Sequence, residues 1–202
     1  ASDIFDKKYS RQLVWSDFAI LYRTNAQSRI FEETLRKKNI PYKIYGGLSF
    51  YERKEIKDIL AYFRMVINPE DEEAFKRTIN YPKRGIGDTT VNRILELASE
   101  TGTSAWQVIA GSHQGVPGLN QGTVTRLRAY LDIVNACRKD LADTDAYSKA
   151  REIAMGSGII KELREGKSPE EVSRYENLEE LLNGIKIFTE SAETNGEPAS
   201  LE

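Results

Sequence analysis

Residues 80–90 read Asn80-Tyr81-Pro82-Lys83-Arg84-Gly85-Ile86-Gly87-Asp88-Thr89-Thr90. Two glycines around one apolar residue predict a tight hairpin whose backbone amides another molecule can approach closely. Asp88 or Thr89 can cap a following helix, because the next apolar residues recur at helical spacing: Val91, Ile94, Leu95 and Ala98. A helix N-terminus attracts phosphate. The stretch therefore predicts either a helix-hairpin-helix that grips a nucleic-acid backbone without reading bases, or an ordinary glycine turn.

The chain beyond Asn68-Pro69 has helical periodicity throughout. Ser104 is a candidate cap for a short helix. Ser168-Pro169-Glu170-Glu171 is a strong helix start, with a Ser cap, Pro at the first helical position and Glu placed for a capping box. A long helix is expected between them from its apolar stripe: Val124, Leu127, Leu131, Val134 and Leu141. We expect a mainly α-helical domain over residues 68–202, without an internal repeat.

The N-terminal third has a different pattern. Residues 18–22 are a short apolar run typical of a buried strand, and residues 41–45 alternate as a strand that stops at Gly46-Gly47. A helical pattern follows each of them. Strand, helix, strand, helix predicts an α/β fragment over residues 1–67, to which further strands must be added because two do not make a stable sheet.

Composition restricts the function only weakly. The formal net charge is −2, but the first 64 residues hold 13 Lys or Arg against 8 Asp or Glu, which leaves 16 against 23 for the rest. This asymmetry permits an anionic partner near the N-terminal third. The single cysteine excludes an internal disulfide, and no apolar run is long enough for a membrane span. We expect a cytoplasmic protein with no membrane partner.

Candidate catalytic, metal and cofactor sites are missing from the sequence. The single histidine, His113, has no cysteine or carboxylate cluster near it. Gly166-Lys167-Ser168 resembles the end of a phosphate-binding loop, but the first glycine of that motif would fall at Lys161. We therefore assign no catalytic residue, no metal ligand and no cofactor-binding residue.

Three basic sites remain as candidates for contact with a phosphate backbone. Arg23 and Asn25 follow the first expected strand, where open α/β sheets place ligands. Lys57 and Arg64 are two helical turns apart, on the non-apolar side that also carries Arg53 and Lys54. The third site is Lys83 and Arg84, beside the hairpin. The alternative for the second site is a solvated helix face paired with Glu52, Glu55 and Asp58.

Four segments resemble superfamily 1 DNA helicases of the UvrD/PcrA/Rep type, and they occur in that family's order. They are Ala19-Ile20-Leu21-Tyr22-Arg23-Thr24-Asn25-Ala26-Gln27-Ser28-Arg29, Tyr45-Gly46-Gly47-Leu48-Ser49-Phe50-Tyr51-Glu52-Arg53-Lys54-Glu55-Ile56-Lys57-Asp58, Pro82-Lys83-Arg84-Gly85-Ile86-Gly87 and Glu176-Asn177-Leu178-Glu179-Glu180-Leu181. The resemblance implies that residues 1–67 are part of the second RecA-like domain, called 2A. Residues 68–202 are then the inserted 2B domain.

The resemblance also implies roles for individual positions. Arg23 and Asn25 match residues that touch single-stranded DNA, and the Gly85-Ile86-Gly87 hairpin with Thr90 matches the part that holds duplex DNA. Lys57 and Arg64 match positions near the junction of the two.

In such enzymes ATP and Mg²⁺ bind to motifs that this sequence lacks. The expected function is the DNA-binding region of an ATP-dependent 3′–5′ helicase, which is inactive alone and works with the parent chain's remaining RecA-like domains. The alternative is a non-enzymatic module that binds DNA or a protein.

Overall fold

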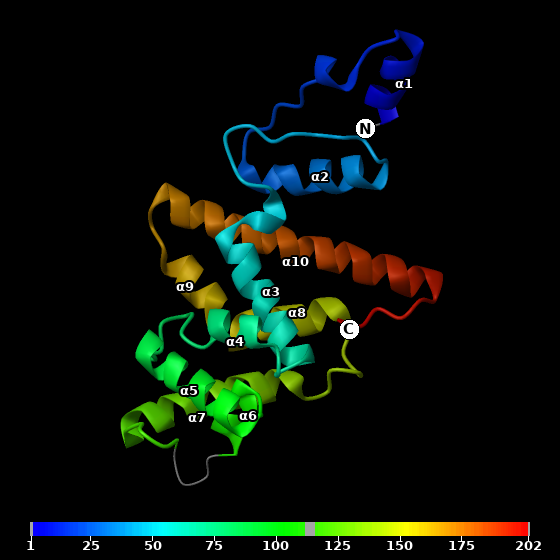
Figure 1. The fold of residues 1–202 in the computed structure, drawn as a ribbon. Coiled ribbons are helices and arrows are strands. Elements are labelled where there is room, and N and C mark those ends of the chain that lie inside the picture. Colours follow the sequence, from blue (N-terminus) through cyan, green and yellow to red (C-terminus); the bar gives the residue numbers. More distant parts are fainter. Residues whose placement is uncertain (1, 112–115, 202) are drawn as a thin grey trace.

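The computed structural model describes residues 2–111 and 116–201, and every regular element in these ranges is helical (Figure 1). The α-helices are α1 (Ser2–Ser10), α2 (Ser28–Lys37), α3 (Lys54–Ile67), α4 (Glu72–Thr78), α5 (Asp88–Thr101), α6 (Ala105–Ala110), α7 (Gln121–Arg138), α8 (Ala146–Gly156), α9 (Ile159–Glu165) and α10 (Pro169–Asn195). Single 3-10 turns are η1 (Trp15–Asp17), η2 (Asn25–Gln27) and η3 (Phe50–Glu52).

Several helices start where the sequence places a capping side chain. Ser104 accepts from the Gln107 amide at the start of α6. Ser168 accepts from the Glu171 amide, and the reciprocal bond from the Ser168 amide to the Glu171 carboxylate completes the predicted capping box of α10. At the starts of α4, α7 and α8 the side chains of Asp71, Asn120 and Asp145 each accept a hydrogen bond from a backbone amide three residues on. Local sequence therefore determines these helix starts.

Helix α3 is the centre of the apolar core. It packs against α4, α7, α8 and α10, and Figure 1 shows it in the middle of these helices. Ile56, Ile59 and Met65 on α3 are fully buried. The core continues through apolar residues of all the later helices and begins in sequence at Phe50, in η3. Helix α2 contributes no residue to this cluster among the described residues.

The α/β prediction for residues 1–67 is wrong, because the described part of this range contains no strand. Residues 18–22 and 41–45 run as irregular segments along α2, and no backbone hydrogen bond between described residues joins them. Two strands bury too little surface to stabilise a sheet, and here side chains of α2 lie between the two segments. The prediction that helix predominates is confirmed.

The molecule is elongated, with two groups of helices at its ends (Figure 1). Helices α1 and α2 lie at one end, and α5, α6 and α7 lie at the other. Helix α10 crosses between α2 on one side and α3 and α8 on the other. This arrangement separates the N-terminal basic site from the hairpin.

Candidate nucleic-acid interface

The hairpin before α5 turns outward around one buried side chain. Gly85 adopts φ +71°, in the left-handed region that favours glycine. Ile86 is only 1% exposed and anchors the turn in the core, whereas Gly85 and Gly87 are exposed. Gly87, with φ −83° and ψ 168°, is the N-cap of α5 and has no side chain to cap it. The prediction that Asp88 or Thr89 is the cap is therefore wrong.

The hairpin's amides divide into two sets. Asn80 Oδ1 accepts from the amides of Arg84 and Ile86, at 3.0 and 3.1 Å. No described residue accepts a hydrogen bond from the amides of Gly85, Gly87, Asp88 and Thr89. A single asparagine thus shapes the bend and leaves the amides at the start of α5 open to a ligand.

Arg84 points into the protein rather than toward solvent. Its guanidinium donates to the carbonyls of Thr78, Pro82 and Ser157, at 3.0, 3.1 and 2.8 Å. It also lies over the rings of Tyr62 and Tyr130. Arg84 therefore joins the hairpin to the turn between α8 and α9, and three of its N–H groups are bonded to carbonyls inside the protein.

Two other cations lie at the outer surface of the hairpin. Lys83 is exposed, and no described residue pairs with it. Arg126, from the exposed face of α7, has Nη1 3.5 Å from the Gly85 carbonyl oxygen. Its side chain also lies 3.5 Å from the place where a Cβ on Gly85 would stand. Sequence reasoning missed Arg126, because only the packing of α7 brings it to the hairpin.

A second turn repeats the hairpin's design. Gly118 has φ +84°, Leu119 packs against the core, and Asn120 caps α7. This is the same order of left-handed glycine, apolar anchor and N-cap as Gly85-Ile86-Gly87. The sequence shows no repeat because only the glycine and the apolar character recur. His113 lies outside the described residues.

Arg23 and Asn25 lie on the surface at the start of α2. Gln27 Oε1 accepts from the amides of Arg23 and Thr24, at 2.9 and 3.2 Å, and this closes the turn of η2. The Arg23 and Asn25 side chains are exposed and form no hydrogen bond or ion pair with a described residue. They are available to a ligand.

Three cations of the predicted basic face of α3 have different surroundings. Lys57 is exposed, and no described residue pairs with it. Arg64 Nη2 lies 2.6 Å from Asp71 Oδ2, so this cation is neutralised by the cap of α4. Arg53 is 8% exposed and hydrogen-bonded inside the protein, so its predicted place beside Lys57 and Arg64 on the non-apolar side is wrong, and so is the alternative of a solvated face at this residue.

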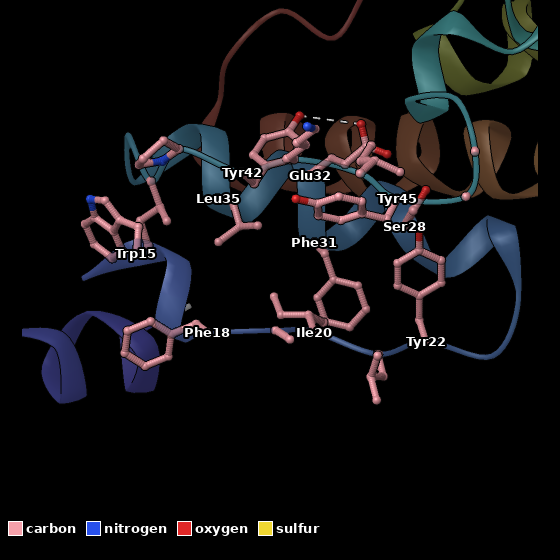
Figure 2. Close-up of a pocket in the computed structure, with 18 of the residues that line it drawn as sticks. Trp15, Phe18, Ile20, Tyr22, Ser28, Phe31, Glu32, Leu35, Tyr42 and Tyr45 are labelled. Carbon is pink, nitrogen blue, oxygen red and sulfur yellow. Dashed lines mark hydrogen bonds between the residues drawn. The ribbon is translucent and has the colours of Figure 1, made fainter. Parts of the chain in front are cut away.

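An apolar hollow of about 730 Å³ opens beside α2. Figure 2 shows Phe18 and Ile20 on one side, Tyr42 and Tyr45 on the other, and Phe31 between them. Tyr45 is 81% exposed, and Leu21 at the margin is 94% exposed. Such a group of exposed apolar side chains is typical of a surface that another part of a protein covers.

The comparisons with known proteins agree with the family that the sequence resembles. Residues 1–202 match the family described as the UvrD-like helicase C-terminal domain. The chain belongs to this family. It is 41% identical over 179 residues to the ATP-dependent DNA helicase PcrA of Bacillus subtilis, which covers 88% of the chain. It is 35% identical over 178 residues to DNA helicase II of Escherichia coli, again over 88% of the chain.

The chain matches only a part of each relative's length. A third relative, the ATP-dependent DNA helicase PcrA of Leuconostoc citreum, is 37% identical and covers 100% of the chain. The chain spans about a quarter of the length of these curated relatives, 24–27%. The resemblance to UvrD/PcrA-type helicases is confirmed at the level of the family.

A metal site and a membrane-spanning helix are both absent from residues 2–111 and 116–201. No group of three or more His, Cys, Asp or Glu side chains in these ranges is arranged to hold a metal ion. No described helix combines the length and the apolar character that crossing a membrane requires.

Proposed function

We propose that this chain is a DNA-binding part of an ATP-dependent 3′–5′ DNA helicase and that its hairpin grips duplex DNA. The observation that carries the proposal is the outward turn at Gly85-Ile86-Gly87, with open amides at the start of α5. Lys83 and Arg126 flank it and supply positive charge. Amides and cations of this kind bind phosphates of any sequence. Thr90, in the first turn of α5, adds a hydroxyl donor.

The roles of Arg84 and Ile86 in this proposal are indirect. The Arg84 guanidinium is bonded to three carbonyls, and the Ile86 side chain is buried. Both therefore fix the shape of the hairpin while other groups meet the phosphate. The Gly85 and Gly87 positions allow close approach because they carry no side chain.

Single-stranded DNA is the proposed ligand of the N-terminal site. The free side chains of Arg23 and Asn25 can donate to a phosphate, and Asn25 can also reach a base edge. Lys57 is free to contact DNA near the junction of strand and duplex. Arg64 reaches DNA only if it leaves Asp71, so we assign it a weaker contribution.

The remaining RecA-like domains of the parent protein are the proposed partners of the hollow beside α2. Its exposed aromatic side chains are apolar surface of the kind that a neighbouring domain covers. We propose that residues before Phe50 belong with that 2A domain. The packing of α3 into the helical core favours a 2A/2B boundary near Phe50 over the predicted one at residue 67.

ATP and Mg²⁺ are proposed to bind elsewhere in the parent protein. This chain alone is then expected to bind DNA without hydrolysing ATP, and its place of action is the cytoplasm.

The duplex-binding proposal is tested by Gly87→Val. Gly87 has extended backbone angles, and no atom lies within 4 Å of the place where a Cβ would stand, so valine fits without strain. Its branched side chain would cover the amides of Gly87 and Asp88. We expect the affinity for a blunt DNA duplex to fall by about tenfold, as measured by fluorescence anisotropy, because charge-assisted hydrogen bonds to phosphate are lost.

Gly47→Val is the matched control, since Gly47 also has open space around it and lies far along the chain from the hairpin. It should leave duplex affinity unchanged. Equal duplex affinity of Gly87→Val and the unsubstituted chain would show that the hairpin is only a turn.

A further inference from the structure

Arg53 is buried beneath the surface that carries Asn25. Its Nη1 donates to the Asn25 carbonyl oxygen at 2.9 Å and to Asn177 Oδ1 at 2.8 Å. Its Nη2 donates to Ser28 Oγ at 2.8 Å. The guanidinium thus connects three elements: η2, the start of α2, and α10.

Asn177 holds the guanidinium in one orientation. Its Nδ2 donates to Glu55 Oε1 at 2.6 Å, which directs Oδ1 of the same amide toward Arg53. The guanidinium lies over the Phe50 ring, 5.3 Å from its centroid. Arg53 is therefore held by hydrogen bonds and by its contact with an aromatic ring.

All three direct acceptors of Arg53 are neutral groups. A guanidinium buried against neutral acceptors gains less than one paired with a carboxylate, while its desolvation still costs free energy. Net stability is therefore a weak explanation for the arrangement. The arrangement mainly fixes a geometry: Nη1 and Nη2 lie in one rigid plane and hold both ends of η2 in place against α10.

We propose that Arg53 is a positioning residue for single-strand binding, held by Asn177 of α10. It fixes the main chain at Asn25 and Ser28, and so presents the exposed Asn25 side chain, with Arg23 two residues before it, at a defined place relative to α10. This inference rests on the proposed function. It assigns no DNA contact to Arg53 itself, whose bonded nitrogens are turned inward.

The rigid fork is the property that the role requires. A lysine at this position keeps the charge but has one nitrogen, which cannot reach the Asn25 carbonyl, the Asn177 amide and the Ser28 hydroxyl in one plane. Arg53→Lys is therefore the informative substitution. Asn177→Ala is a second variant, which leaves Arg53 in place and removes its orienting partner.

The first readout is amide hydrogen exchange, which needs no DNA. Arg53→Lys and Asn177→Ala should each speed exchange of the amides of residues 23–28 by about tenfold, because lost bonds to a charged group favour local opening. Amides of the hairpin at Ile86 should exchange as before. Unchanged exchange over residues 23–28 in both variants would overturn the proposal.

The second readout is the affinity for a labelled single-stranded oligonucleotide at several salt concentrations. Arg53→Lys should lower it about threefold to tenfold with an unchanged salt slope, because no phosphate contact is lost. Combined with Asn25→Ala, it should cause less loss than the sum of the two single losses, because part of its effect acts through Asn25. If Arg53→Lys reduces the salt slope of strand binding by about one, Arg53 is a phosphate ligand and the proposal is contradicted. Fully additive losses of affinity for Arg53→Lys and Asn25→Ala would contradict it as well.

The two readouts separate this inference from the proposed function. Faster exchange with undiminished strand affinity overturns the positioning role. If Arg23→Ala and Asn25→Ala also leave strand affinity unchanged, the proposed strand site is what has failed.

Discussion

Lys83 and Arg84 are adjacent cations with opposite environments. Lys83 is exposed, while Arg84 donates to three carbonyls and lies over two tyrosine rings. We expect Arg84→Lys to lower the free energy of unfolding by about 1–3 kcal/mol, because buried carbonyls lose a charged donor. Lys83→Ala should change it by less than about 0.5 kcal/mol. Urea denaturation measures both.

For binding to duplex DNA, we expect the substitution at Lys83 to matter more than the one at Arg84. Lys83→Ala is expected to lower the salt slope of binding by about one, and Arg126→Ala should do the same. Arg84→Lys should leave the slope as it is, provided that binding is measured where the variant is folded. Equal unfolding free energies for Arg84→Lys and Lys83→Ala would refute the structural role of Arg84.

At the scale of elements, the start of α4 combines a cap with an ion pair. Partial burial disfavours the charged form of Asp71, but the Ala74 amide and the Arg64 guanidinium outweigh this and hold its pKa below the ordinary 3.8. A lowered pKa stabilises the fold above the unfolded-state value and loses that effect as pH falls through the folded-state value. Asp71→Asn should therefore destabilise at pH 7 by less than about 1 kcal/mol, since Arg64 is half-exposed.

The difference in the free energy of unfolding between Asp71→Asn and the unsubstituted chain should become smaller as pH falls below 3.8. At pH 7 the same difference should become smaller in about 1 M salt, because salt screens the ion pair. Asp145→Asn is the control, because Asp145 caps α8 without a cation within ion-pair distance among the described residues. Its effect at pH 7 should not depend on salt. Denaturation curves at several pH values give the loss of unfolding free energy in Asp71→Asn. If this loss is the same at every pH, the charge of Asp71 does not contribute to stability.

At the scale of the whole molecule, α2 is joined to α10 by polar contacts rather than by the main core. Arg29 binds Glu33 on α2 and Glu180 on α10, each at 2.8 Å. Its guanidinium lies over Gly184, where a Cβ would stand 2.5 Å from Nη1. We expect Gly184→Ala to displace Arg29 and to speed amide exchange in α2, while exchange in α3 stays as it is.

Gly122→Ala is the control for the helical propensity that alanine adds, because a Cβ at Gly122 meets only Asn120 Oδ1, at 3.4 Å. It should leave α2 unchanged. If Gly184→Ala leaves exchange in α2 unchanged as well, α2 is held by contacts other than the one through Arg29.

Local sequence determined the features that depend on neighbours along the chain. The capping box at Ser168 needs only residues 168–171, and the periodicity of α3 needs only its own apolar residues. The bend at Gly85 follows from a glycine that can adopt positive φ. These features could be predicted because their energetics are settled within one or two turns. The four family segments were likewise contained in the sequence itself.

Tertiary structure alone decided which cations are free. Arg53 and Lys57 are four residues apart at the start of α3, yet α10 and η2 cover the first and leave the second exposed. Arg84 turns inward because Ser157, distant in sequence, supplies a carbonyl, and Arg126 reaches the hairpin through the packing of α7. Tertiary structure also decided that residues 18–22 and 41–45 form no strands. A strand exists only when another strand accepts its hydrogen bonds, and that partner is a property of the fold rather than of the segment.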